Sequence, residues 1–243
     1  MKELNELRLA VLIDADNIPY SNVKGIMEEI ARYGTPTFKR IYGDWTKPNL
    51  SGWKAVLLEN AITPIQQYGY TTGKNSTDSA MIIDAMDILY SGRTDGFCIV
   101  SSDSDFTRLA IRLREAGMRV IGIGEKKTPN AFIVACDKFI YIEIINVVIG
   151  EIVPKTEADM PAVQKSELIK IISTAINDLT EEDNGWAFLG EVGNLILKKQ
   201  PDFDPRNYGF PKLLPLIRSI NRFEIDERDS GKNNIKHIYI RKK

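Results

Sequence analysis

The sequence predicts an α/β domain with a mostly parallel sheet, followed by a small winged-helix domain. Short runs rich in Val and Ile alternate with amphipathic helical stretches over the first 147 residues. These runs lack polar alternation, as expected for strands that helices cover on both faces. After residue 163, three helical segments precede two short strand-like segments, which is the order of a winged helix.

Six strands, with helices between them, are predicted in the first domain. The strand segments are residues 9–14, 38–42, 62–66, 96–101, 119–123 and 139–144. One helical segment begins at Pro19 and ends before Gly34, and its early Pro and late Gly fit capping preferences. The other helical segments are residues 53–60, 77–90, 106–116 and 129–137. Repeated strand–helix–strand units predict right-handed crossovers and therefore a parallel sheet.

A segment with two prolines and mixed charges interrupts this pattern. We therefore expect a first domain at residues 1–147, a linker at 148–163 and a second domain at 164–243. In the second domain, the predicted helices are residues 166–179, 189–199 and 209–220, and the predicted strands are 222–226 and 236–241. Trp186 and Phe188 fall at helical spacing with the apolar residues that follow, which predicts a core-packing role.

Composition excludes several classes of protein. No apolar run reaches the roughly 18 residues of a membrane span and the N-terminus lacks a signal-peptide core, so we expect a cytoplasmic protein without membrane contact. The single histidine, His237, leaves none for a catalytic triad or zinc site in the first domain. Cys98 and Cys136 are expected to be buried, reduced thiols. The net charge of −1 neither supports nor excludes RNA as a partner.

Four aspartates stand where predicted strands end or helices begin. Asp14 ends the first strand, Asp78 opens a helix, and Asp103 and Asp105 follow the fourth strand. Residues just past the carboxyl ends of parallel strands gather at one edge of the sheet, where open α/β folds bind ligands. Clustered carboxylates need a cation, and oxygen ligands select Mg²⁺ or Mn²⁺. The pattern therefore predicts a metal site for phosphodiester chemistry.

Structural roles stay open for several acids of this region. Asp16 is expected to cap the helix near Pro19, and the charge of Asp78 also suits a helix N-terminus. Of the two acids after the fourth predicted strand, Asp105 fits an N-cap position better than Asp103. Asp84 lies about 240° around the helix from Asp78, so we expect a supporting carboxylate or a structural ion pair.

Polar and basic side chains complete the predicted site. Asn17, Ser101 and Ser102 are expected to orient carboxylates or to contact metal-bound or phosphate oxygens. The candidate RNA-binding cations are Lys74, Arg108 and Arg112 in the first domain and Lys198, Lys199 and Lys212 in the second. Solvated surface charge is the alternative role for each of these cations.

Three motifs of the first domain resemble the NYN domain. They are Asp-Ala-Asp-Asn at 14–17, Gly-Lys-Asn-Ser-Thr-Asp at 73–78 and Ser-Ser-Asp-Ser-Asp-Phe at 101–106. The resemblance covers residues 8–145, and both the order and the spacing of the motifs agree. The NYN domain is a branch of the PIN-like nuclease superfamily, close to its LabA-like and limkain-type members.

This resemblance implies a PIN-like three-layer α/β/α sandwich and, for active members, Mg²⁺- or Mn²⁺-dependent ribonuclease activity. The positions that correspond to the family's acidic residues are Asp14, Asp78, Asp103 and Asp105. Asn17 matches the family's asparagine, whereas Ser102 stands where relatives often carry glycine.

The second half resembles the LOTUS domain, also called OST-HTH, over residues 164–242. Its motifs are Gly-Trp-Ala-Phe-Leu-Gly-Glu-Val-Gly at 185–193, Pro-Asp-Phe-Asp-Pro-Arg-Asn-Tyr-Gly-Phe-Pro-Lys-Leu at 201–213 and Phe-Glu-Ile at 223–225. Family members are winged-helix modules that bind RNA or protein partners and often accompany NYN domains. The resemblance implies either kind of partner for this domain.

Three functions are compatible with the sequence. The leading hypothesis is a ribonuclease that cuts single-stranded RNA internally, and the alternative is a non-catalytic RNA-binding or scaffold protein. A third hypothesis, a haloacid-dehalogenase-type phosphatase, follows from Asp14 and Asp16 but meets two obstacles. Asp103 and Asp105 are too closely spaced for that family's late motif, and Asn17 replaces its glycine. The sequence makes no prediction of the oligomeric state.

Overall fold

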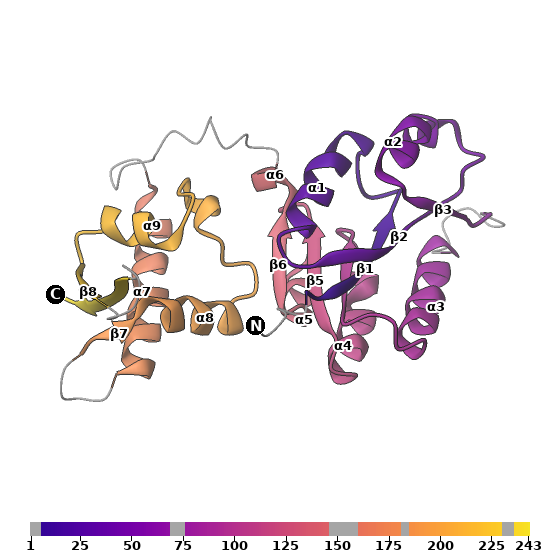
Figure 1. Ribbon diagram of the computed structural model, residues 1–243. Helices are drawn as coiled ribbons and strands as arrows, with labels where there is room; N and C mark the ends of the chain where they lie inside the picture. Colours follow the sequence, from indigo (N-terminus) through magenta and orange to yellow (C-terminus); the bar gives the residue numbers. More distant parts are fainter. Residues whose placement is uncertain (1–5, 69–75, 146–159, 181–184, 230–235) are drawn as a thin grey trace. The chain divides into compact units, whose positions relative to one another are not determined.

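A parallel sheet of six strands forms the centre of the N-terminal half of the chain (Figure 1). In chain order, the strands are β1 (Arg8–Asp14), β2 (Thr35–Gly43), β3 (Thr63–Gln66), β4 (Gly96–Val100), β5 (Arg119–Gly124) and β6 (Lys138–Tyr141). Their order across the sheet is β3-β2-β1-β4-β5-β6. The carboxyl end of β1 therefore lies between those of β2 and β4.

The computed structural model describes residues 6–68, 76–145, 160–180, 185–229 and 236–243 of the chain. The chain divides into two units, Met1–Asn146 and Val147–Lys243, and each is described by itself. Within the described ranges, no helix has the length and apolarity that a membrane crossing requires.

Helices cover both faces of the parallel sheet (Figure 1). One face packs against α1 (Val23–Ile30), α2 (Trp53–Asn60) and α6 (Ile142–Ile145), and the other against α3 (Ser76–Tyr90), α4 (Thr107–Glu115) and α5 (Asn130–Ala135). Along β1, Val11 and Ile13 face the first set of helices and Leu12 faces the second. Both faces of β1 are thus buried, which explains its unbroken apolar sequence. The predicted α/β/α sandwich is confirmed.

The last predicted strand, residues 139–144, is divided in the structure. β6 ends at Tyr141, and residues from Ile142 onward form α6. Ile142 and Ile144 are nevertheless buried in the core. A short run of buried aliphatic residues looks the same in a strand and in a helix, so the boundary was not visible in the sequence.

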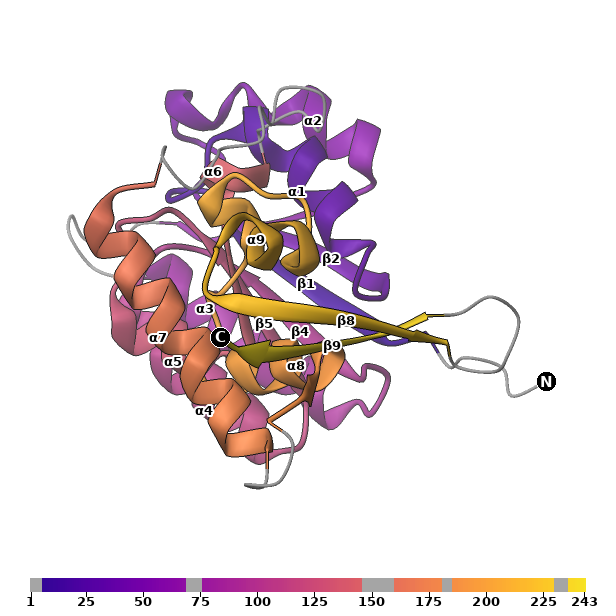
Figure 2. The ribbon, with the colours of Figure 1, turned by 90° about the vertical axis from the view of Figure 1, so that its left-hand side faces the viewer.

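The C-terminal half consists of helices packed on a small antiparallel sheet. Its elements are α7 (Ala162–Leu179), β7 (Ala187–Phe188), α8 (Leu189–Lys199), α9 (Leu213–Ser219), β8 (Phe223–Asp229) and β9 (Lys236–Lys242). The strand order is β7-β9-β8, and Figure 2 shows β8 and β9 side by side as a long ribbon. Three helices and a terminal hairpin agree with the predicted winged-helix domain.

Two details of this half differ from the sequence expectation. Met160 is buried in the core and α7 begins at Ala162, so part of the expected linker folds with the second unit. Phe188 was expected on a core-packed helix, but it pairs with Tyr239 in the sheet. The helical interpretation of Trp186 and Phe188 was therefore wrong.

Candidate metal centre

Three aspartates from two separate segments meet at the carboxyl edge of the parallel sheet. Asp78 lies in the first turn of α3, and Asp103 and Asp105 lie between β4 and α4. One carboxylate oxygen from each residue lies within 4.8 Å of the other two. Mg²⁺–oxygen distances are about 2.1 Å, so small rotations of these side chains would bring one oxygen of each carboxylate around a single ion.

Asp14, the fourth predicted ligand, lies beside this group but is not one of its three members. Its side chain is buried, and Oδ2 accepts hydrogen bonds from Asn17 Nδ2 at 2.5 Å and from Ser101 Oγ at 2.9 Å. Oδ1 accepts from the backbone N–H of Asp16 at 3.1 Å. Burial raises the pKa of Asp14, and the hydrogen bonds oppose that rise. They offset part of the cost of burying a carboxyl group.

Ser101 connects Asp14 to the turn that carries the other acids. While its hydroxyl donates to Asp14, its oxygen accepts from the backbone N–H of Asp103 at 3.1 Å. Asp103 in turn caps the 3₁₀ helix at Ser104–Phe106, because its Oδ1 accepts from the Asp105 N–H at 2.9 Å. Asp105 was the expected cap, but the residue with extended backbone, at φ −86° and ψ 132°, is Asp103.

Ser102 contributes to the sheet edge in a different way. Its hydroxyl oxygen accepts from the backbone N–H of Glu125 at 2.9 Å. Glu125 directly follows β5, so Ser102 connects the carboxyl ends of β4 and β5. Ser101, and not Ser102, donates to the carboxylate of Asp14.

Asp84 binds β2 and does not join the acidic group. It forms an ion pair with Arg40 and accepts a hydrogen bond from the buried hydroxyl of Tyr42. Tyr42 is also the β2 residue opposite Asp14, and its carbonyl accepts from the Ala15 N–H at 3.0 Å. Tyr42 thus connects the strand end that carries Asp14 to the helix that carries Asp78.

Two further acids lie at this edge of the sheet, and the sequence did not assign them to the site. Asp16 makes no capping bond to the helix that follows Pro19, and instead its carboxylate lies 4.0 Å from Lys47 Nζ. Asp44 directly follows β2, is buried, and accepts from Gln66 Nε2 at 2.9 Å. Asp44 was recognisable by the criterion that identified Asp14, an acid at the carboxyl end of a buried strand.

The electrostatic effect of this grouping is largest at Asp78. Its partial burial, followed by the charges of Asp14, Asp103, Asp105 and Asp16, raises its pKa to about 6. Among the described residues, neither Asp78 nor Asp103 has a Lys or Arg partner within 4.0 Å. A bound cation would favour the ionised carboxylates and remove this repulsion.

The predicted cations of the first unit lie on α4 and in the segment before α3. Arg108 is exposed in the first turn of α4, three residues after Asp105. Arg112 donates to the Tyr90 hydroxyl at 3.1 Å. Lys74 lies outside the described residues.

The predicted cations of the second unit lie on α8 and at the start of α9. Lys199 forms an ion pair with Asp178. Lys198 and Lys212 are exposed. Lys199 is therefore less available to a phosphate than the other two.

Comparison with protein families identifies both halves of the chain. The NYN domain family matches residues 8–143, more than half of the sequence. The chain belongs to the NYN family. The OST-HTH/LOTUS domain family matches residues 160–235, so this NYN protein carries an OST-HTH domain after its nuclease-like domain. NYN domains are in general ribonucleases and the OST-HTH domain implies RNA binding. The match leaves the phosphatase hypothesis without support.

Two solved structures are similar to parts of this NYN protein. A protein of unknown function from Vibrio parahaemolyticus RIMD 2210633 is 18% identical, with a TM-score of 0.48, over 57% of this chain and 94% of its own. An uncharacterized protein from Nitrosomonas europaea is 35% identical, with a TM-score of 0.30, over 37% of this chain and 86% of its own. Neither likeness adds information about activity. No curated protein matches the chain.

Proposed function

We propose that this NYN protein is a divalent-metal-dependent ribonuclease that cuts single-stranded RNA internally, with an OST-HTH domain that binds RNA or a partner. The observation behind the proposal is the approach of Asp78, Asp103 and Asp105 to within 4.8 Å at the carboxyl edge of the sheet. Their repulsion contributes to the raised pKa of Asp78. Three carboxylate oxygens without nitrogen or sulfur ligands fit Mg²⁺ or Mn²⁺.

The residues of the proposed site have different roles. Asp78, Asp103 and Asp105 would hold the ion, which, when bound, would neutralise charge on the phosphodiester and activate water for attack at phosphorus. Ser101 and Asn17 fix the orientation of Asp14 beside them. Because residues 1–162 contain no histidine, proton transfer in this site is left to carboxylates, Lys, Tyr or water.

Cleavage of end-labelled RNA by the purified full chain tests this proposal. We expect cleavage with Mg²⁺ or Mn²⁺ and none with EDTA. Fragments of intermediate length from both the 5′-labelled and the 3′-labelled RNA would indicate internal cuts. Asp103→Asn should lower the rate by about 100-fold or more, since a metal ion contributes several kcal/mol to catalysis. The asparagine oxygen can still accept the capping bond from Asp105, so the fold should persist.

Asp87→Asn is the matched control, because Asp87 is an exposed acid on the same helix as Asp78. Its cleavage rate should equal that of the unchanged protein. Full cleavage by Asp103→Asn, or cleavage that persists in EDTA, contradicts the proposal. RNA binding without cleavage under either ion supports the non-catalytic RNA-binding alternative.

A further inference from the structure

The sheet of the OST-HTH domain has one face that its hydrophobic core does not use. Ala187, Phe223 and Ile240 point from this sheet into the core. Side chains at alternate strand positions point to the opposite side. Six of them, which we call the wing face, are Trp186, Phe188, Arg228, His237, Tyr239 and Arg241.

Three rings of the wing face lie next to one another across β7 and β9. Phe188 is paired with Tyr239, and their ring centroids are 5.8 Å apart. The Phe188 and His237 centroids are 5.4 Å apart. His237 is exposed, while Phe188 and Tyr239 are half-buried. The rings therefore form a row that keeps contact with solvent.

Two guanidinium groups lie over the aromatic rings of the wing face. The Arg228 guanidinium carbon is 4.2 Å from the Tyr239 ring centroid and 5.5 Å from that of Trp186. The Arg241 carbon is 4.6 Å from the Trp186 centroid. These distances are those of cation–π contacts, so the arginine planes extend the aromatic surface.

Two acids fix the arginines in these positions. Glu224 accepts from Arg241 Nε at 2.6 Å, and Asp226 accepts from Arg228 Nε at 2.8 Å. The described bonds to these acids use only Nε, and each guanidinium carries four further N–H donors on its terminal nitrogens. The two acids also cancel the two positive charges, so this surface offers planar groups and N–H donors rather than a positive field.

We propose that the wing face is a base-stacking site for single-stranded RNA. Unpaired bases present flat π faces that stack on aromatic rings and guanidinium planes, whereas the bases of a duplex are not accessible in this way. The inference rests on the proposed RNA-directed function and names the surface by which the OST-HTH domain holds the substrate.

The charge balance predicts how this binding depends on salt. The wing face can bring at most two arginines to phosphates, so this surface should contribute only about −1.4 to the slope of the logarithm of affinity against the logarithm of salt concentration. Binding driven by many lysines would give a much steeper slope. Loss of one stacking ring should weaken binding about tenfold.

Fluorescence anisotropy with a labelled, unstructured RNA and the full chain in EDTA tests the proposal without cleavage. Tyr239→Val keeps a β-favouring residue and should lower affinity about tenfold. Arg228→Lys keeps the charge but loses the plane, and we expect a severalfold loss. Arg218→Lys, on α9 and paired with Glu227, is the matched control and should bind normally. Circular dichroism of each variant checks folding.

Normal RNA binding by both folded wing-face variants would overturn the proposal. Equal affinity for duplex RNA, or stronger binding of single-stranded DNA of the same sequence, would also overturn it. A chain that binds no RNA but loses a protein partner in these variants would assign the surface to that partner instead. Absence of RNA cleavage would contradict the proposed ribonuclease activity but not the wing-face proposal, since RNA binding in EDTA does not depend on cleavage. In an active nuclease, the variants should raise KM and leave kcat unchanged.

Discussion

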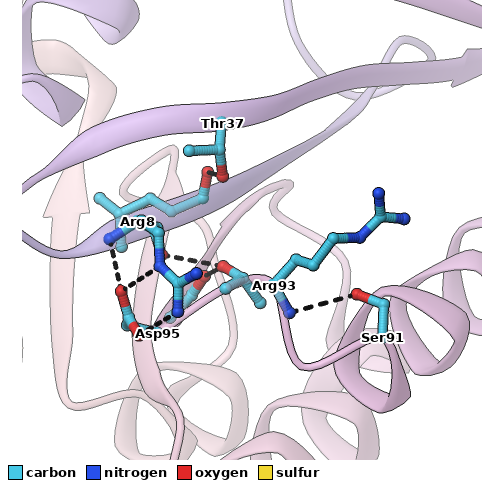
Figure 3. A network of polar contacts seen from close by, with 8 residues as sticks. Arg8, Thr37, Ser91, Arg93 and Asp95 are labelled. Carbon is cyan, nitrogen blue, oxygen red and sulfur yellow. Dashed lines mark hydrogen bonds and ion pairs between the residues drawn. The ribbon is translucent and has the colours of Figure 1, made fainter.

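The two ends of the parallel sheet differ in how they accommodate carboxylates. At the amino ends of β1 and β4, Arg8 binds Asp95 through its backbone N–H at 2.9 Å and its guanidinium at 2.9 and 2.8 Å (Figure 3). At the carboxyl ends, Asp78 and Asp103 have no Lys or Arg within 4.0 Å in the described part of the chain. At the amino ends, Asp95 is paired with an arginine. At the carboxyl ends, several aspartates lie close together.

The pKa values of two aspartates express this difference. Hydrogen bonds from Arg8 lower the pKa of Asp95 to about 2, whereas burial and neighbouring acids raise that of Asp78 to about 6. The first carboxylate is ionised at little cost and serves the fold. The second is ionised at a cost, and carboxylates with a pKa raised in this way cluster at functional sites.

The largest expected effect is on metal binding at the carboxyl edge. Asp78→Asn should weaken Mn²⁺ binding by about 100-fold or more, because it removes one of three carboxylate ligands. Asp95→Asn, at the other end of the sheet, should leave the affinity unchanged. Electron paramagnetic resonance of free Mn²⁺ during titration measures both. Equal Mn²⁺ affinity in the two variants would remove the distinction between the ends.

Ser101→Ala tests whether a buried hydroxyl organises the acids. The variant leaves Asp14 without one donor and the Asp103 N–H without its acceptor, so unfolding should become easier by about 2 kcal/mol. Mn²⁺ affinity should also fall by about tenfold. Ser104→Ala, at an exposed position in the same turn, is the control. Urea unfolding and Mn²⁺ titration are the measurements, and a wild-type result in both would exclude this role.

Asp84 and Asp78 lie on the same helix, one with an arginine and one without. Asp84→Ala should lower the free energy of unfolding by about 2 kcal/mol, because Arg40 and the buried Tyr42 hydroxyl lose their acceptor. Asp78→Asn should instead raise the free energy of unfolding of the metal-free protein, because it removes repulsion among the acids. Urea denaturation of both variants in EDTA checks the signs. A lower free energy of unfolding in both variants would contradict the expected difference between Asp84 and Asp78.

The stability of the metal-free protein should depend on pH through Asp78. Its pKa is raised from 3.8 to about 6, so its contribution is fully present below pH 3.8 and is lost as pH rises through 6. After allowance for solvent screening, the loss is about 1 kcal/mol. Asp78→Asn should remove this pH dependence, and Mn²⁺ should reverse the loss in the unchanged protein. Urea unfolding between these pH values in EDTA measures it.

The contribution of Asp95 to stability should be the smallest of these effects, and its pH dependence should be opposite to that of Asp78. Its pKa is lowered from 3.8 to about 2, so its contribution is present above pH 3.8 and is lost as pH falls through 2. Arg8 and Asp95 are 47% and 37% exposed, so salt should screen the pair. Asp95→Asn should lower the unfolding temperature slightly at neutral pH and not near pH 2. Asp87→Asn is the control for a generic change of surface charge.

The sequence predicted those features that depend on strand order and failed where distant segments meet. The acids at strand ends were recognisable, because parallel strands bring all their carboxyl ends to one edge. The pairing of Asp84 with Arg40 joins residues 44 positions apart, and no local pattern indicates it. β7 has only two residues and pairs with β9 some fifty positions later, so periodicity in that segment gave the wrong element.

Tyr42 has a consequence for how the ion would enter. Its backbone is bonded to the residue after Asp14, and its ring reaches across to Asp84 on α3. A rigid aromatic side chain therefore sets the separation between β1 and the helix that presents Asp78. Little ordering entropy is lost on binding when the ligand-bearing elements are already fixed. The ion should therefore exchange with solution without a folding step.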